Sequence, residues 1–280
     1  MKKQIWLVTG ASKGLGLILV QKLLSEGYKV AATSRSIADL EKAVSAKTDN
    51  FLPLAMNITD EADIATGMQQ IVTHFGGIDV VVNNAGYGIV GALEEVSDAE
   101  ARKNFDVNVF GSLNVIRGAL PYLREQRSGH IFNIASIGGF TGAFPAFSIY
   151  CAAKFAVHGF TESLATELKP LGIDVTVVSP GYFRTNFLDA GSLGIAAKEI
   201  AGYDNVREVQ HAHQHNINNN QQGDPEKAAA VMIATAQMQH PTLHLFLGQD
   251  AYDLADAKMK AVQQDLLAMQ ALATATAFDK

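Results

Sequence analysis

Tyr150 and Lys154 are the two residues in this sequence whose types and spacing best suit acid–base chemistry. On a helix, side chains four residues apart lie on the same face, one turn from each other. A phenol titrates near pH ~10, but a cation held beside it favours the phenolate and lowers its pKa. Lowering that pKa by roughly three units takes about 4 kcal/mol, at ~1.36 kcal/mol per unit. The pair therefore predicts a tyrosine general acid or base, although the same spacing also occurs on ordinary amphipathic helices.

A glycine-rich turn near the N-terminus is the second feature with chemical meaning. It joins an apolar run, Gln4–Thr9, to a helical pattern over Leu17–Ser25, and a second apolar run follows at Lys29–Ser34. Strand, glycine turn, helix and strand form the dinucleotide-binding unit, in which the backbone approaches a pyrophosphate at a helix N-terminus. An ordinary glycine turn is the alternative. The cofactor contacts predicted in this turn are Gly10, Ser12, Lys13, Gly14, Leu15 and Gly16.

The end of the second apolar run predicts which nicotinamide cofactor binds. A site for NAD usually places an acidic residue there, which binds the ribose 2′-hydroxyl. This chain has Ser34 and Arg35 instead, and residues 31–36 contain no acid. Arg35 could form two hydrogen bonds with a 2′-phosphate, Ser34 could donate one, and Lys13 points into the same region. We therefore predict NADP(H), against the alternative that both cations are solvated surface residues.

The rest of the chain continues the alternation of strands and helices. Further strands are predicted at Phe51–Met56, Asp79–Val82, Gly129–Ala135, Ile173–Ser179 and Thr242–Leu247. Helices are predicted at Glu61–Phe75, 98–127 with a bend near Gly111, Tyr150–Leu171, Ala196–Tyr203, 224–240 and from about Ala251 onward. This alternation predicts an α/β fold with one doubly wound, parallel, seven-stranded sheet of the Rossmann type. We expect residues 1–280 to form a single domain, in which the polar segment 183–222 is a lid over a substrate pocket.

Several predicted strands end in residues that suit ligand binding. Ligands of open α/β sheets bind outside the carboxyl ends of the strands. Asn83-Asn84-Ala85-Gly86, Ser136 and Pro180-Gly181 each follow a predicted strand directly. Asn108 interrupts the helical pattern of residues 98–127 with an amide, which usually faces solvent or has a specific partner. These residues are therefore candidates for the same site as Tyr150.

The composition limits the classes of function. A chain of 280 residues with 48% apolar side chains can bury a large core, and a net charge of −6 without a basic cluster argues against nucleic-acid binding. No window has the roughly 18 apolar residues that span a bilayer, and the first apolar run is too short for an export signal. The single cysteine, Cys151, excludes an internal disulfide and fits a reducing compartment. We expect a cytoplasmic protein without a membrane partner, in which Cys151 packs as a small apolar residue.

Three histidines in the predicted lid suggest another chemistry. His211, His213 and His215 occupy alternating positions, so on a strand their imidazoles would lie on one face and could bind zinc. A cysteine or carboxylate that would complete such a site is not evident nearby. A polar lid is the preferred interpretation, and no metal site is predicted.

The motifs occur in an order that resembles the short-chain dehydrogenase/reductase family, in its single-domain form. They are Thr9–Gly16, Asn83–Gly86, Asn108, Ser136, Tyr150 with Lys154, and Pro180-Gly181. Residues 223–248 resemble, more weakly, the hydroxysteroid- and retinol-dehydrogenase-like branch. The resemblance implies that Tyr150 is the general acid or base, while Lys154 lowers the pKa of Tyr150 and holds the nicotinamide ribose. It also implies that Ser136 hydrogen-bonds the reacting oxygen and that Asn108 anchors a proton-relaying water.

The resemblance implies cofactor contacts beyond the glycine turn. They are Asn57, Ile58, Asn83, Ala85, Gly86, Tyr150, Lys154, Pro180, Gly181, Phe183 and Thr185. Asn57 stands where the family usually has an aspartate that contacts the adenine amine, a bond that an amide oxygen can still accept. Ser136 precedes Tyr150 by 14 residues (150 − 136), one more than is usual in the family. The loop 142–148 should therefore reshape the pocket wall, with Ser148 as a poorer alternative hydroxyl.

The resulting hypothesis is an NADP(H)-dependent oxidoreductase that interconverts a carbonyl and a secondary alcohol by hydride transfer. A bulky apolar or aromatic substrate is expected from a candidate pocket of Tyr87, Ile89, Phe140, Phe144, Phe183, Phe187 and Leu188. A non-catalytic NADP(H)-sensing binding protein is the alternative, against which the complete catalytic set argues. A nucleotide-sugar epimerase or dehydratase would usually carry different glycine spacing and a larger C-terminal domain. The resemblance also implies a homodimer or homotetramer that packs through helices 98–127 and 150–171.

Overall fold

A parallel sheet of seven strands forms the middle layer of the computed structural model, which describes residues 4–189 and 191–278. The strand order is β3-β2-β1-β4-β6-β7-β9. The strands are β1 (Ile5–Val8), β2 (Lys29–Ser34), β3 (Phe51–Ala55), β4 (Val80–Asn83), β6 (Gly129–Ile134), β7 (Ile173–Pro180) and β9 (His244–Leu247). Strand order reverses between β1 and β4, which is where open α/β sheets bind ligands. The predicted doubly wound, seven-stranded parallel sheet is confirmed.

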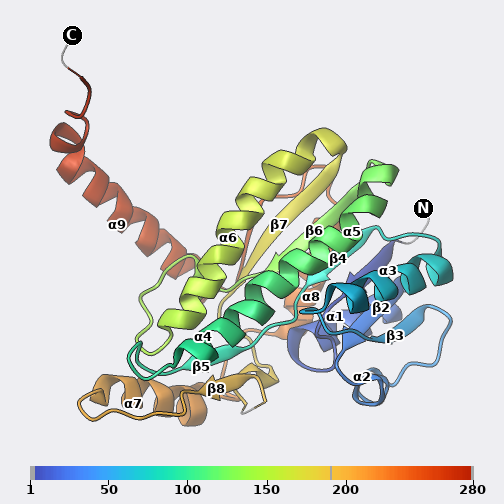
Figure 1. Ribbon diagram of the computed structural model, residues 1–280, viewed down its shortest axis with the longest axis horizontal. Helices are drawn as coiled ribbons and strands as arrows, with labels where there is room; N and C mark the ends of the chain where they lie inside the picture. Colours follow the sequence, from blue (N-terminus) through green and yellow to red (C-terminus); the bar gives the residue numbers. More distant parts are fainter. Residues whose placement is uncertain (1–3, 190, 279–280) are drawn as a thin grey trace.

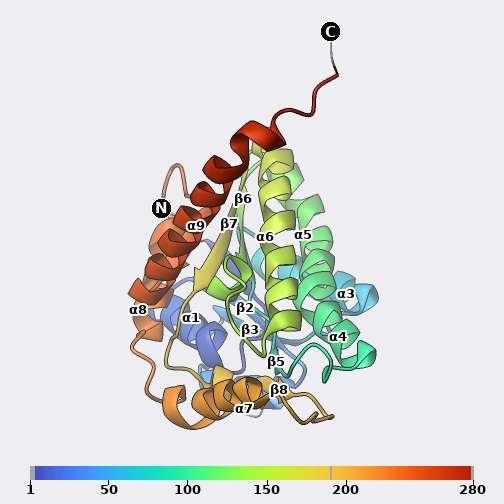
Figure 2. The same cartoon turned by 90° about the vertical axis from the view of Figure 1, so that its left-hand side faces the viewer.

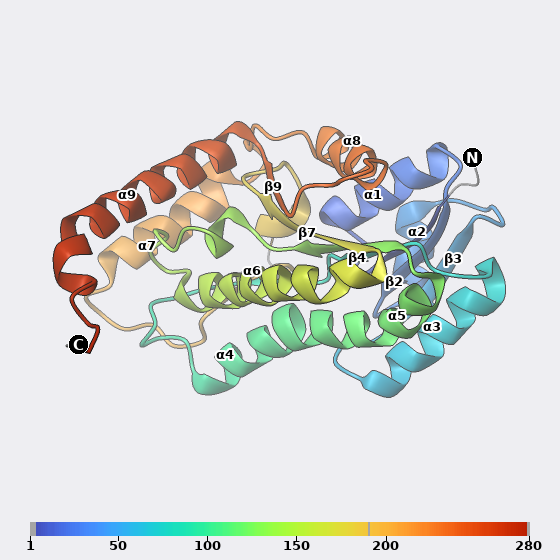
Figure 3. The same cartoon turned by 90° about the horizontal axis from the view of Figure 1, so that it is seen from above.

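Helices cover both faces of the sheet, as the view from above shows (Figure 3). One face carries α1 (Gly14–Ser25), α2 (Ile37–Val44) and α8 (Pro225–Ala236). The other carries α3 (Glu61–Phe75), α5 (Ser112–Gln126) and α6 (Ser148–Leu168). The helix α2 was not predicted, and the Ser36 hydroxyl caps it by accepting from the Asp39 N–H. Two helical layers around one sheet leave the strands buried on both sides.

The strand β1 shows why the apolar runs in this sequence are uninterrupted. Trp6 and Val8 belong to the core between the sheet and α1 and α8, whereas Ile5 and Leu7 belong to the core on the α3 and α5 side. Since successive strand residues point to opposite faces, both sets must be apolar in a covered sheet. All four side chains are buried.

The helix predicted for residues 98–127 is divided by a π-helical turn, Asp106–Gly111. It separates α4 (Asp98–Phe105) from α5, and the bend expected near Gly111 falls at the end of this turn. A Cβ atom on Gly111 would lie 2.6 Å from the Ile58 side chain, so the turn packs closely on its neighbour. Single π-helical turns are frequent at functional sites. This one contains Asn108.

The lid segment differs from its prediction in secondary structure. The helix predicted at Ala196–Tyr203 is wrong: this stretch is extended or turned, and the helix α7 begins afterwards, at Asp204–His211. The backbone N–H groups of Ala197 and Ile200 donate to the carboxylates of Glu100 and Glu95, at 3.0 Å and 2.9 Å. These tertiary hydrogen bonds hold the backbone of this stretch in a non-helical conformation. A short strand before it, β8 (Leu193–Ile195), pairs with β5 (Gly88–Val90) in a small parallel sheet that was not predicted.

The three lid histidines lie on helical backbone, at the end of α7 and in the π-helical turn Ala212–Ile217. Residues two apart on a helix point to different sides, so the strand interpretation of these imidazoles is wrong. His213 is buried, and its Nε2 lies 2.9 Å from the Tyr182 hydroxyl oxygen. His211 and His215 approach each other, with ring centroids 4.6 Å apart.

The C-terminal helix α9 (Gln249–Ala273) begins against the sheet and then projects away from the body (Figure 1). Its first part contacts β9 and the turn Ile137–Gly139, and the view turned by 90° shows the helix on the same side of the sheet as α1 and α8 (Figure 2). Ala251 and Ala255 are its buried residues, and the remainder is mostly exposed. Across residues 4–189 and 191–278, no helix has the length and apolarity needed to cross a membrane.

Candidate active site

A cavity of about 610 Å³ opens at the carboxyl ends of the central strands, under the lid segment. Most of the predicted cofactor and catalytic residues line it. These are Gly10, Ser12, Lys13, Gly14, Leu15, Ser34, Arg35, Asn57, Ile58, Ala85, Gly86, Ser136, Tyr150, Lys154, Pro180, Gly181, Phe183 and Thr185. Three others, Gly16, Asn83 and Asn108, lie outside the lining and support it from behind.

Tyr150 and Ser136 meet inside this cavity. Tyr150 lies in the first turn of α6, and Ser136 follows β6 directly. The Ser136 side chain lies near the Tyr150 hydroxyl and lowers the pKa of that phenol. The Gly138 N–H donates to the Ser136 Oγ at 3.1 Å, so the serine proton remains available for the tyrosine or for a substrate oxygen. The two hydroxyls therefore present one polar point within an otherwise aromatic wall.

Lys154 lies one helical turn beyond Tyr150 and is only 5% exposed. Its ammonium donates to the Ile134 carbonyl at 2.8 Å and lies 5.9 Å from the centroid of the Tyr150 ring. A Cβ atom on Gly86 would come within 3.5 Å of the Lys154 Nζ and 2.4 Å of the Asn108 Oδ1. The glycine therefore lets the ammonium and the amide approach the same spot.

The π-helical turn fixes Asn108 in this position. The side-chain amide of Asn108 donates to the carbonyls of Tyr87 and Asn104, both at 3.0 Å, and its oxygen accepts from the Tyr87 N–H at 3.2 Å. Asn108 thus has the specific partners that a buried amide within a helix requires. Asn108 therefore connects the loop at Tyr87 to the helical segment that contains Asn104.

Burial shifts the two titratable groups in opposite directions. Desolvation raises the pKa of Tyr150 well above its usual value, and the hydrogen bond from Ser136 partly offsets this. Desolvation lowers the pKa of Lys154 to about 8. The phenol is therefore protonated at neutral pH but is a weaker acid than a free phenol, which is opposite to the lowering expected from Lys154.

The glycine turn is held in place by Asn84, which belongs to the predicted turn Asn83–Gly86 but not to the predicted cofactor contacts. The Asn84 side-chain N–H donates to the carbonyls of Thr9 and Gly10, at 2.9 Å and 3.0 Å. Gly10 adopts a φ of +64°, and a Cβ there would lie 2.7 Å from the Ala85 Cα. Gly16 leaves room for the Asn84 amide, which a Cβ would approach to 2.3 Å. Glycine is required at both positions.

The start of α1 is open to a ligand. Its N-cap residue, Lys13, makes no side-chain capping hydrogen bond, so the first N–H groups of α1 keep their capacity to bind an anion. Gly14 has a φ of +62°, and the nearest atom to a Cβ there would be 4.0 Å away, on Thr185. A pyrophosphate fits this arrangement.

The end of β2 carries cations and no carboxylate. Lys13, Arg35, Lys103 and Lys154 line the cavity, and none of the described lining residues is acidic. The Lys13 ammonium donates to the Gly191 carbonyl at 2.6 Å. Burial lowers the Lys13 pKa, and repulsion from Arg35 lowers it further, which shows that the two cations share one region.

Two predicted contacts are already engaged in local turns. The Ser34 hydroxyl donates to the Ser36 carbonyl at 2.6 Å. The Asn57 Oδ1 accepts from both the N–H and the hydroxyl of Thr59, at 3.2 Å and 2.8 Å. Both side chains still line the cavity, but the bonds predicted for them compete with these turns.

Asn83 faces away from the cavity and is buried. Its Nδ2 donates to the Asn133 Oδ1 at 2.8 Å on the neighbouring strand. Asn83 is the last residue of β4, and the chain turns into the cavity only at Asn84. Asn84, the residue that directly follows the observed end of β4, is the asparagine that lines the cavity.

The turn after β7 depends on Asp250 at the start of α9. The Asp250 carboxylate accepts from the Tyr182 N–H at 2.7 Å. A Cβ on Gly181 would lie 2.2 Å from this carboxylate, so only glycine fits there. Asp250 is 68 residues from Tyr182 in the sequence, and the motif at residues 180–185 gives no sign of it.

The aromatic part of the cavity agrees with five of the seven predicted pocket residues. Tyr87, Phe144, Phe183, Phe187 and Leu188 line the cavity. Ile89 and Phe140 do not: Ile89 is buried in β5, and Phe140 packs against Phe246 with ring centroids 5.1 Å apart. Phe147, Tyr182 and His213 also line the cavity and were missed.

The comparisons with known proteins identify the family. The model for short chain dehydrogenases matches residues 4–192, and the chain belongs to this oxidoreductase family. An uncharacterized oxidoreductase of Schizosaccharomyces pombe is 34% identical over 98% of this chain and 91% of its own length. A 3-ketodihydrosphingosine reductase of Bacteroides thetaiotaomicron is 41% identical over 68% of this chain and 67% of that protein.

Solved structures agree with the fold and with a nicotinamide cofactor. A short-chain dehydrogenase from Streptomyces avermitilis superposes with a TM-score of 0.90, at 34% identity, over 99% of this chain and 100% of its own. ElxO, solved with NADP bound, has a TM-score of 0.72 at 26% identity, over 90% and 99% of the two chains. A 3-ketoacyl-(acyl-carrier-protein) reductase from Brucella melitensis, solved with NADH, has a TM-score of 0.73 at 25% identity, over 87% and 96%. Neighbours with either cofactor occur.

Proposed function

We propose that this protein is an NADP(H)-dependent oxidoreductase that interconverts a carbonyl and a secondary alcohol. The observation that carries the proposal is that Tyr150 and Ser136 line the same cavity, with the buried Lys154 ammonium one helical turn beyond Tyr150. The bound nicotinamide supplies or accepts the hydride. The residues of the chain supply the proton and fix the reacting oxygen.

Each polar group has one task in this scheme. In the reducing direction, the Tyr150 hydroxyl donates its proton to the carbonyl oxygen as the alkoxide forms. The Ser136 hydroxyl donates a hydrogen bond to the same oxygen, in an orientation fixed by the Gly138 N–H. The Lys154 ammonium stabilises the phenolate that remains. Asn108, which lies beside Lys154 at Gly86, holds the loop that closes this end of the site.

The choice of NADP(H) over NAD(H) rests on charge. A 2′-phosphate is a dianion near neutral pH, and Lys13 and Arg35 line the cavity, whose described lining contains no acidic residue, although Asp189 lies near Lys13. An acidic residue that would bind a ribose 2′-hydroxyl is missing from the end of β2. The NADP-bound neighbour supports this choice, and the NADH-bound one shows why it needs a test.

The substrate class follows from the wall around Tyr150. The Phe187 ring centroid lies 5.9 Å from that of Tyr150, and the Phe147 centroid 6.2 Å. Apolar rings around a single polar point favour a bulky apolar or aromatic ketone or alcohol. The name of the Bacteroides relative, a reductase of a 3-keto compound, points the same way.

The test is NADPH oxidation over a panel of aryl and long-chain ketones, with Tyr150→Phe as the variant. Removing a general acid should reduce kcat by roughly 10²–10⁴-fold while NADPH binding, followed by fluorescence, is retained. A variant with near-full turnover would show the assigned role to be wrong. Tight NADPH binding by the wild type, with no turnover on any carbonyl or alcohol, would favour the non-catalytic sensing protein instead.

We also propose how the chain works in the cell. It acts as one unit, 1–280, in the cytoplasm, where its buried Cys151 stays reduced. Burial raises the pKa of this thiol to about 11, which keeps it unreactive.

A further inference from the structure

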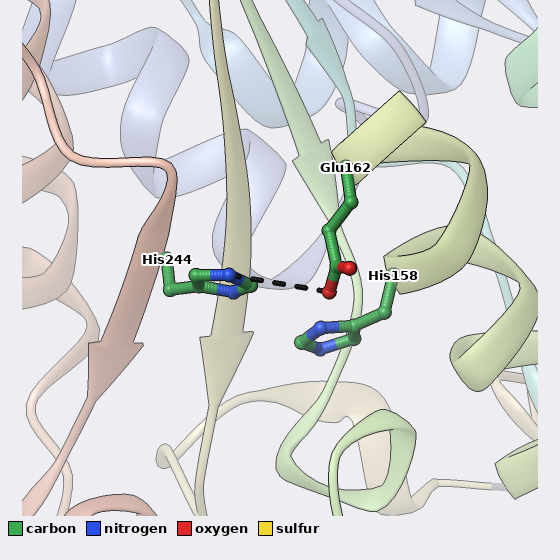
Figure 4. Close-up of side chains that lie close together, drawn as sticks. All are labelled: His158, Glu162 and His244. Atoms are coloured by element: carbon green, nitrogen blue, oxygen red, sulfur yellow. Dashed lines mark ion pairs between the residues drawn. The ribbon is translucent and has the colours of Figure 1, made fainter. Parts of the chain in front are cut away.

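A cluster of three potential metal ligands lies outside the cavity. His158 and Glu162 are on α6, four residues apart, and His244 is on β9 (Figure 4). One ligand atom from each of the three residues lies within 4.8 Å of the others. None of the three lines the active-site cavity. The proposed oxidoreductase reaction does not use them.

His158 is placed as metal-ligating histidines usually are. Its side chain is 5% exposed, and its Nε2 lies 2.9 Å from the Ser179 hydroxyl oxygen. Among the described residues, its Nδ1 has no hydrogen-bond partner. Histidines that bind metals typically use one ring nitrogen for the ion, while the other is oriented by a hydrogen bond. Ser179 would be that orienting group.

His244 and Glu162 form a long ion pair when the imidazole is protonated, drawn as the dashed line in Figure 4. The His244 Nε2 and the Glu162 Oε1 are 4.0 Å apart, too far for a hydrogen bond. The His244 Nδ1 is buried without a hydrogen-bond partner among the described residues. Figure 4 shows the carboxylate between the two imidazoles, with all three groups directed at the same space.

We propose that His158, Glu162 and His244 bind one Zn²⁺ ion, with water completing a tetrahedral site. Two nitrogens and one carboxylate oxygen form a donor set typical of zinc, whereas Mg²⁺ and Ca²⁺ prefer oxygen donors. Tetrahedral ligands at roughly 2.0–2.2 Å from the ion lie about 3.4 Å from one another. The described spacing of up to 4.8 Å therefore needs to contract by as much as about 1.4 Å (4.8 − 3.4). Side-chain rotation can supply this, because Glu162 and His244 are 53% and 37% exposed.

The site would connect the edge strand to the catalytic helix. β9 contributes only four residues at the edge of the sheet, and α6 carries Tyr150 and Lys154. Ser179, which orients His158, directly precedes Pro180 and Gly181 at the cavity wall. Zinc would therefore brace both walls of the active site from outside, without touching substrate.

The experiment measures metal binding directly and so does not depend on activity. Chelator-treated protein is titrated with ZnCl₂ by calorimetry and with Co²⁺ by visible spectroscopy. We expect one Zn²⁺ per chain, a thermal transition raised by Zn²⁺ but not by Mg²⁺, and the intense d–d absorption of tetrahedral Co²⁺. Glu162→Gln and His244→Asn, at partly exposed positions, should each weaken binding at least tenfold.

The matched control is the double variant His211→Asn/His215→Asn. It removes two histidines that lie next to each other in the lid segment, outside the proposed metal site. It should bind Zn²⁺ as the wild type does. Folding of every variant is checked by circular dichroism and NADPH binding in metal-free buffer. The proposal is overturned if the wild type binds no Zn²⁺, if both single variants bind it unchanged, or if only the control variant loses it. If the wild type binds Zn²⁺ but turns over no ketone, that result contradicts the proposed reaction and leaves the zinc proposal standing.

Discussion

Burial changes the pKa values of Tyr150 and Lys154 in opposite directions, and the rise at Tyr150 makes the phenol a weaker acid, so charge stabilisation by Lys154 is needed when the proton leaves. Burial keeps the phenol protonated by raising its pKa, and it lowers the pKa of the amine to about 8. The amine is then charged at neutral pH but close to losing its proton. The pair is sensitive to pH through the lysine and not through the tyrosine.

A pH profile of ketone reduction should show this. Below pH 8, Lys154 is mostly protonated and stabilises the phenolate, so kcat/KM should be level. Above that value the free enzyme loses the ammonium charge, and kcat/KM should fall with an apparent pKa of about 8. NADPH binding measured at each pH separates this loss from weaker cofactor binding. A profile that stays level to pH 10 would contradict the assignment.

Arg35 should determine the preference for NADPH. Arg35→Ala removes a charge-assisted contact with the 2′-phosphate, worth about 1.5–3 kcal/mol, so KM for NADPH should rise roughly 10- to 150-fold. KM for NADH should change little. Arg127→Ala, which removes an arginine distant from the cavity lining, serves as the control. Equal effects on both cofactors would show that Arg35 does not contact the phosphate.

Single residues were predictable where a motif fixes their position on a helix or after a strand, and unpredictable where tertiary packing decides. Tyr150, Lys154 and Ser136 face the cavity as expected. Asn83 and Asn84 are adjacent and chemically identical, so only the exact end of β4 decides which one enters the cavity. Phe140 was expected in the pocket, but it packs on Phe246 from a distant strand.

Among the elements, the lid is the part that tertiary contacts determine. Glu95 is buried, accepts from the N–H groups of Ala92 and Ile200 at 2.8 Å and 2.9 Å, and pairs with Arg207 on α7. The hydrogen bonds from the backbone and Arg207 hold the Glu95 pKa below its usual value. One carboxylate therefore ties the loop after β5 to two parts of the lid.

Glu95→Gln should loosen the lid without disturbing the cofactor site. The amide cannot pair with Arg207, so we expect KM for the ketone to rise about tenfold, with NADPH affinity unchanged. Glu61→Gln, which removes an exposed partner of Arg117, is the control and should change neither value. Parallel losses in cofactor and ketone affinity would mean that Glu95 supports the whole fold and not the lid.

The strands and the lid differ in how far local sequence determines them. The central strands are buried on both faces, which forces continuous apolar runs that can be read directly. Residues 196–203 have a helix-compatible composition, yet the side-chain oxygens of Glu95 and Glu100 capture their backbone N–H groups. Those bonds join residues about a hundred positions apart, beyond the reach of local patterns.

At the scale of the whole molecule, exposed aromatic rings indicate where a second copy would pack. Phe110, in the π-helical turn, is 51% exposed, and Phe155, on α6, is 42% exposed. Both belong to the long helices that the resemblance assigns to an interface, and these segments are in contact. We propose that this surface forms the homodimer or homotetramer.

Light scattering with size-exclusion chromatography tests this assembly. Phe110→Asp/Phe155→Asp should convert the oligomer to a monomer, because burying two carboxylates at an interface is costly. Tyr252→Asp changes a ring on α9 that is 59% exposed and should leave the mass unchanged. If Tyr252→Asp dissociates the protein and the double variant does not, the interface lies on α9.

Lys13 links two parts of the molecule through a single ammonium. It donates to the Gly191 carbonyl, in the stretch that crosses the substrate entrance, and it lies beside Arg35. An ammonium has three protons, so one can remain on the carbonyl while another meets a phosphate. Binding of the nucleotide should then reduce the motion of the segment around Gly191 before the ketone binds. We therefore expect an ordered turnover cycle, in which the nucleotide binds first and leaves last.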